Sequence, residues 1–96
     1  MCSLIAEASF DSISQNKQRY KLTIGIGQPI YDGNVWTCEV HLNNEIVKVH
    51  GEDSLQALCM AHHIVKCHLK LSKALYFPGT NNALSVSIYY PDDPVM

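Results

Sequence analysis

Three residues near the middle of the chain, Cys59, His63 and Cys67, have the types and spacing of a metal site. Each lies four positions after the one before, so a helix would place all three along one side. Thiolate sulfur and imidazole nitrogen are good zinc ligands, and one helix can supply two or three of them. His50 or His41 would be candidates for a fourth ligand. In the competing interpretation the cysteines pack as small apolar residues and His63 is solvated.

No local pattern identifies a catalytic group. A nucleophile needs a base and an orienting group beside it, and no signature joins the cysteines and histidines of this chain in that way. Gly25 and Gly27 lie within a predicted strand with no helix after it, so they do not form a phosphate-binding loop. The sequence therefore favours a protein that is not an enzyme, and it predicts no cofactor.

Composition excludes two classes of partner. The 96 residues carry a net charge of −2, and the seven Lys and Arg residues are scattered from Lys17 to Lys73, so no basic patch is predicted for nucleic acid. No apolar run approaches the roughly 20 residues of a membrane-spanning helix. The first ten residues lack a positive start and contain Glu7, which is not typical of a signal peptide. We expect one cytoplasmic domain, residues 1–96, whose four cysteines are free thiols.

Alternation of apolar and polar residues predicts an antiparallel sheet. The first strand should place Leu4, Ala6, Ala8 and Phe10 on one face, and residues 11–18 should form a loop. The expected strands, in chain order, are 3–10, 19–27, 35–42, 45–50 and 84–90.

The clearest element is a hairpin around Asn43-Asn44, two residues that suit a type I′ turn. That turn would pair Val40 with Val47 and set Glu39 opposite Lys48, so the apolar pattern and the charge pair agree on one register. A two-residue turn at residues 32–33 would not suit the strands 19–27 and 35–42. It would put the odd-numbered residues of strand 19–27 on the core face, whereas the apolar residues of that strand are even-numbered. We therefore predict a bulge near residues 25–29, or a longer loop there.

A helix should begin after Asp53, an N-cap residue with Gln56 as its capping-box partner, and run from Ser54 to about Lys73. At about 100° per residue its core stripe would be Leu55, Leu58, Ala61, Val65 and Leu69. His62 lies beside this stripe and is expected to have no chemical role.

A second flank of the same helix is also mostly apolar, and it contains Met60, Ile64, Cys67, His68 and Leu71. A helix that covers one sheet needs a single apolar stripe, and only 17% of the residues are charged. We therefore interpret the second flank as an interface, with His68 as a buried or pH-sensitive contact within it. The leading hypothesis is a homodimeric protein-interaction module of the immunity or antitoxin kind, with an unidentified partner as the other possibility.

Residues 51–55 read G-E-D-S-L and resemble the G-x-D-S-L attachment motif of acyl and peptidyl carrier proteins. That resemblance implies a phosphopantetheine arm on Ser54. Carrier proteins are helical bundles, whereas the residues before Gly51 alternate as strands. Plain helix capping is the alternative interpretation of the motif.

The longer run 51–58, G-E-D-S-L-Q-A-L, together with Trp36 and Cys38, resembles a family of small bacterial domains of unknown function. The resemblance implies a strand hairpin followed by a helix and carries no activity. The fold we predict is a two-layer α+β domain in which four to five antiparallel strands pack on the helix at about 54–73.

Overall fold

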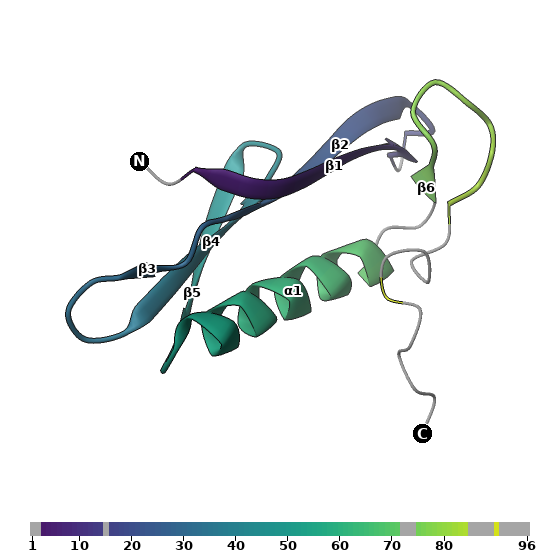
Figure 1. The fold of residues 1–96 in the computed structure, drawn as a ribbon. Coiled ribbons are helices and arrows are strands. Elements are labelled where there is room, and N and C mark those ends of the chain that lie inside the picture. The colour runs from purple at the N-terminus through teal and green to yellow at the C-terminus, as the bar shows by residue number, and fades with distance from the viewer. Residues whose placement is uncertain (1–2, 15, 72–74, 85–89, 91–96) are drawn as a thin grey trace.

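The computed structural model describes residues 3–14, 16–71, 75–84 and 90, and this part of the chain has six strands and one helix in two layers (Figure 1). The elements are β1 (Leu4–Ile13), β2 (Arg19–Gly27), β3 (Ile30–Tyr31), β4 (Trp36–Leu42), β5 (Glu45–Gly51), α1 (Ser54–Leu71) and β6 (Leu75–Tyr76). The predicted α+β class, an antiparallel sheet covered by one helix, is confirmed. Two strands of two residues each raise the strand number above the predicted four to five.

The sheet is antiparallel between all of its paired strands. β4 pairs with β5 along one edge and with both β2 and β3 along the other. β1 lies on the far side of β2, and β6 pairs with β1 only at Asp11 and Ser12. The chain therefore runs across the sheet from β1 to β5, crosses one face as α1, and returns to β1 as β6.

The β4–β5 hairpin has the predicted register, with Val40 opposite Val47 and Glu39 opposite Lys48. The turn differs from the prediction, because a type I′ turn needs positive φ at both central residues and only Asn43 of the two has one, at 56°. The Asn43 N–H donates to the carbonyl of Thr23 at 2.9 Å, which ties the turn to β2.

The predicted irregularity between β2 and β4 is confirmed. Ile26 pairs with Val40 and Ile30 pairs with Thr37, so residues 27–29 lie opposite only residues 38–39. The bulge is the alternative that occurs near residues 25–29, and the connection from β3 to β4 is a separate four-residue loop, 32–35. The Asp32 carboxylate holds that loop by accepting hydrogen bonds from the N–H groups of its residues 34 and 35 at 2.9 and 3.0 Å.

β1 differs from the prediction at both of its ends. It continues through the expected loop to Ile13, because its polar end pairs with β2, for example Asp11 with Lys21. Near its start the register shifts between Leu4 and Ala6, so Leu4 lies opposite Gly27. This irregularity turns Leu4 to the sheet face away from the helix, and the prediction that it shares a face with Ala6 was wrong.

The helix begins as predicted. The Asp53 carboxylate accepts the Gln56 N–H at 2.7 Å, and the Gln56 side chain accepts the N–H of Glu52 at 2.6 Å. The core stripe is rotated from the prediction, because Leu55 is 69% exposed and Ala57 takes its place. The predicted end at Lys73 lies outside the described residues.

One apolar core fills the space between the sheet and the helix. Its buried members are Phe10, Leu22, Ile24, Ile26, Cys38, Val40, Leu42, Val49, Ala57, Ala61, Val65, Leu69, Leu75 and Leu84.

Most of the predicted last strand, residues 85–89, lies outside the described residues. No helix in the described part of the chain has the length and apolar character needed to cross a membrane.

Candidate functional site

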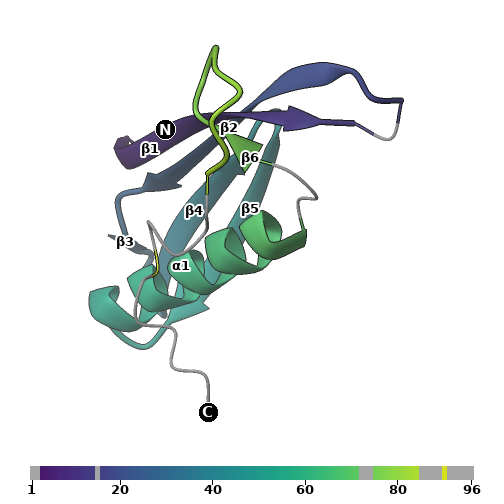
Figure 2. The same cartoon turned by 90° about the vertical axis from the view of Figure 1, so that its right-hand side faces the viewer.

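The position of α1 over the sheet separates two surfaces. The helix packs on β4 and β5 and touches β2 only slightly, so the inner face of β1 extends beyond it (Figure 2). One flank of α1 therefore faces β1 and β2, and the other faces the outer edge of β5. His62 marks the first flank, because it lines a pocket together with residues of both β1 and β2.

The second flank lies along the outer edge of β5. At about 100° per residue, Met60, Ile64, Cys67 and Leu71 fall roughly on the opposite side of the helix from His62. Met60 is 42% exposed and Leu71 is 82% exposed, whereas Ile64 is half-buried against the core. These four residues are called the edge flank below. They belong to the interface predicted from the sequence, whose fifth member, His68, is also half-buried.

The outer edge of β5 is unpaired within the described part of the chain, since β5 pairs only with β4. The Asn43 N–H donates to Thr23 of β2. Because successive residues of a strand direct their N–H and C=O groups to opposite sides, the even-numbered residues of β4, such as Leu42, direct theirs to β5. Their partners on β5 are odd-numbered, for example Glu45 opposite Leu42. The N–H and C=O groups of residues 46, 48 and 50 therefore point away from β4, at the open edge.

The outer face of the sheet carries polar side chains above this edge. His50 lies directly across from Thr37, and its Nδ1 atom is 3.0 Å from the Thr37 hydroxyl. Glu39 lies across from Lys48 in register, but its carboxylate contacts the Nε2 atom of His41 at 3.0 Å. His41 and His50 are therefore on the sheet face away from α1. They cannot complete a metal site on the helix.

The structure brings together two of the three predicted metal ligands. The Cys67 sulfur lies 3.7 Å from Nε2 of His63, and Cys59 is exposed on the same side of the helix one turn earlier. Within the described part of the chain, no group of three or more His, Cys, Asp or Glu residues is arranged to hold a metal ion.

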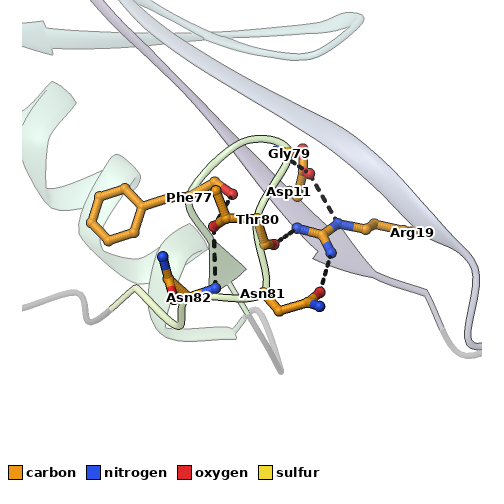
Figure 3. Close-up of polar contacts among 7 residues, drawn as sticks. All are labelled: Asp11, Arg19, Phe77, Gly79, Thr80, Asn81 and Asn82. Carbon is orange, nitrogen blue, oxygen red and sulfur yellow. Dashed lines mark hydrogen bonds and ion pairs between the residues drawn. The ribbon is translucent and has the colours of Figure 1, made fainter.

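A cluster of polar contacts fastens the loop after β6 to the β1–β2 hairpin (Figure 3). Arg19 Nε is 2.9 Å from the Asp11 carboxylate, and the same carboxylate oxygen accepts the Gly79 N–H at 2.9 Å. The guanidinium also donates to the Asn81 side chain at 2.9 Å and to the Thr80 carbonyl. Asp11 and Arg19 both bond to the loop residues 79–81, so we interpret the cluster as one that holds this loop in place.

The electrostatics of this cluster follow from the same contacts. The pKa of Asp11 lies below its usual 3.8, first because the Gly79 N–H donates to the carboxylate and further because the Arg19 guanidinium is beside it. The guanidinium carbon also lies 5.0 Å from the centre of the Tyr76 ring, within cation–π range. Thr80 accepts the Asn82 N–H at 3.1 Å, which orders the loop itself.

Sequence reasoning gave no role to His62, yet the structure places it at the edge of a pocket. Its Nδ1 atom lies 3.0 Å from the Tyr90 hydroxyl, and the two rings meet edge-on. No sequence signal could have found this pair, because the residues are 28 positions apart and their meeting depends on where the helix crosses the sheet.

An antiparallel sheet covered on one face by a single helix defines a small α+β domain. The chain belongs to the family described as Domain of unknown function (DUF6968), which it matches over residues 7–88. No curated protein and no solved structure matches the chain significantly.

Proposed function

We propose that the protein is an interaction module that forms a homodimer through the open edge of β5 and the edge flank of α1. The observation that carries this proposal is that an exposed apolar helix flank lies alongside a strand edge that no other described strand pairs with. An unpaired edge is a template for another strand. An apolar flank beside that edge gives the contact a hydrophobic component that backbone hydrogen bonds alone lack.

A two-fold axis perpendicular to the sheet would satisfy both features at once. It would pair β5 with β5 of a second copy as antiparallel neighbours, which makes the contact self-complementary. The two copies of α1 would then lie beside each other on the same face of one continuous sheet, with their edge flanks in contact. Lys48 stands at the middle of β5, and like charges directly opposite each other are destabilising. The axis should therefore pass beside another residue of the strand.

The strand edge can be tested with a single backbone donor. The Lys48 N–H points to the open edge, so Lys48→Pro removes a donor to the second copy and no hydrogen bond to β4. Lys48→Ala is the matched control, because it loses the same side chain and keeps the N–H. We expect light scattering coupled to gel filtration to show a dimer for the native chain and for Lys48→Ala, and a folded monomer for Lys48→Pro.

The helix flank has its own matched pair. Met60→Lys combined with Leu71→Lys charges the edge flank, whereas Leu55→Lys charges an exposed leucine on the His62 side of the helix. We expect the first variant to be monomeric and the second to remain dimeric, both with native circular dichroism. A native chain that is monomeric at all concentrations would overturn the proposal, as would a dimer that survives both Lys48→Pro and the double lysine variant.

Cytoplasmic location and an immunity- or antitoxin-like role in a bacterium belong to the same proposal. Cys59 and Cys67 are exposed free thiols, which supports a reducing compartment. The resemblance of residues 51–58 to a family of small bacterial domains supports a bacterial source. The exposed apolar surface supports a protein partner.

Metal binding by Cys59, His63 and Cys67 is the alternative proposal, and the contact between the His63 and Cys67 side chains supports it. A zinc titration followed by calorimetry tests it, with His63→Ala as the variant and His50→Ala as a control on the other face of the sheet. Bound zinc should raise the melting temperature, and a chelator should reverse the increase. An unchanged melting temperature with zinc would contradict this alternative.

A further inference from the structure

A pocket of about 150 Å³ lies on the opposite flank of α1 from the proposed dimer surface. Its lining surface is almost entirely apolar, with Ala6, Ala8, Ile24 and Val65 contributing to it, and His62 and Tyr90 also line it. The pocket exists because α1 covers β4 and β5 and leaves the inner face of β1 largely uncovered. β1 carries only alanines at the two inner positions before Phe10, and these short side chains leave the space empty.

His62 and Tyr90 contact each other at one side of the pocket. The Tyr90 hydroxyl lies 3.0 Å from Nδ1 of His62, and the two ring centres are 5.8 Å apart at 78°. Burial raises the pKa of Tyr90, so its hydroxyl stays protonated at neutral pH. A tyrosine hydroxyl that donates to an imidazole nitrogen still has oxygen lone pairs that can accept a hydrogen bond from a ligand.

The lining also indicates the charge of a suitable ligand. None of the described residues that line the pocket is a lysine or an arginine, so an anion there would lose its hydration without a described partner of opposite charge. Among the described lining residues Glu7 is the one acidic residue, and it is exposed. The pocket is open to solvent on one side, and enclosed apolar cavities of about the same volume in other proteins bind benzene-sized molecules.

We propose that this pocket binds a small, uncharged aromatic molecule with one hydroxyl group, of the size of phenol. The ring packs between the alanines of β1 and Val65 of α1, and the hydroxyl donates to Tyr90. This site does not depend on the proposed dimer, because it uses the other flank of the helix and the strands β1 and β2, away from the edge of β5.

The test uses phenol and toluene as probes of the 96-residue chain, and binding is followed by amide chemical shifts in NMR. Phenol and toluene have rings of the same kind, and only phenol can donate a hydrogen bond. We expect both to shift amides of the lining residues, with phenol binding more tightly. Ala8→Leu should fill the pocket and weaken both probes by about tenfold or more, a loss of about 1.4 kcal/mol. Ala83→Leu adds the same side chain at an exposed position and should change neither affinity.

Tyr90→Phe separates the hydrogen bond from the cavity. It removes the hydroxyl and keeps the ring, so the preference for phenol over toluene should disappear while toluene affinity stays the same. The proposal is overturned if neither probe shifts the lining amides, or if Ala83→Leu weakens binding as much as Ala8→Leu does. It is also overturned if the preference for phenol survives in Tyr90→Phe.

Discussion

Gly51 lies so close beneath Ala57 that a Cβ atom at position 51 would come within 2.8 Å of the Ala57 Cα. Gly51 ends β5, and Ala57 is fully buried in the first turns of α1. The helix can approach the strand only because neither residue has a large side chain. This contact explains two positions of the G-E-D-S-L-Q-A-L run, and the capping bonds of Asp53 and Gln56 explain two more.

Substitution of Gly51 by alanine should destabilise the fold strongly. The added methyl would meet backbone atoms of Ala57, which cannot rotate away as a side chain can. Overpacking of this kind typically costs about 1–3 kcal/mol, and we expect the upper part of that range. Urea unfolding followed by circular dichroism measures the change. Gly25→Ala is the comparison, because its methyl would press only on the end of the Leu4 side chain and would meet the Ala6 carbonyl at an ordinary contact distance of 3.5 Å, so it should cost less.

The N-cap gives a second prediction. Asp53→Ala removes the carboxylate that accepts the Gln56 N–H and should lower the free energy of unfolding by about 1 kcal/mol. Ser54→Ala, one residue later at the exposed helix start, should change it little. If the two variants are equally destabilised in thermal melts, the capping interpretation of the motif is wrong.

The Asp11 carboxylate should titrate below its usual pKa of 3.8. A carboxyl group with a lowered pKa in the folded state stabilises the fold above the unfolded-state pKa, and that contribution is lost as the pH falls through the folded-state pKa. We therefore expect the fastening of the loop at Gly79 to weaken below pH 3.8. An NMR titration of the Asp11 carboxyl carbon and the Gly79 amide measures this.

Arg19→Met provides the internal comparison for that titration. It should raise the pKa of Asp11 only in part, because the Gly79 N–H is the larger cause of the shift and remains. Asp32 also has a lowered pKa, held by the N–H groups of Val35 and Asn34 far from Arg19. Its titration should stay unchanged in the variant, and a shift there would point to a general disturbance of the fold.

The hairpin could be predicted from the sequence because several local signals agreed on its register. Its apolar alternation, its turn residues and the Glu39–Lys48 pair all required the same pairing. The bulge after β2 was also predictable. The apolar residues of β2 are even-numbered, whereas a two-residue turn at 32–33 would have placed its odd-numbered residues on the core face. At β1 no such conflict existed, since Leu4 continues the apolar pattern of Ala6 and Ala8. The shift between Leu4 and Ala6 is set by pairing with β2 and left no local trace.

The helix shows a different limit of sequence reasoning. Its start and its two apolar stripes were predictable, but its rotation was not. Leu55 has the right spacing for the core, yet the close approach of Ala57 to Gly51 turns Leu55 outward. The pocket beside His62 depends in turn on how α1 crosses the sheet. Periodicity fixes which residues share a face, whereas contacts between distant segments decide which face is covered.

The two exposed cysteines of α1 report separately on the proposed dimer. Cys67 belongs to the edge flank, whereas Cys59, eight residues earlier, lies about 80° around the helix from it, on the side toward His62. If the dimer protects Cys67, this residue reacts with a thiol reagent only in the monomer. By mass action, about a fifth of the chains are monomeric when the total chain concentration is ten times the dissociation constant of the dimer. The Cys67 rate should therefore fall about fivefold as concentration rises to that level, while the Cys59 rate stays constant.

Variants that keep only one of these cysteines make the two rates separable, with Cys38 retained in both. Cys38 is fully buried and should react only after unfolding, so it gives a baseline for global opening in the same experiment. If the reaction rates of Cys59 and Cys67 depend on protein concentration to the same extent, the contact surface lies on the side of the helix that faces away from the sheet. Constant rates at both positions would mean that α1 takes no part in self-association, and that only the β5 edge remains as a surface for a second copy.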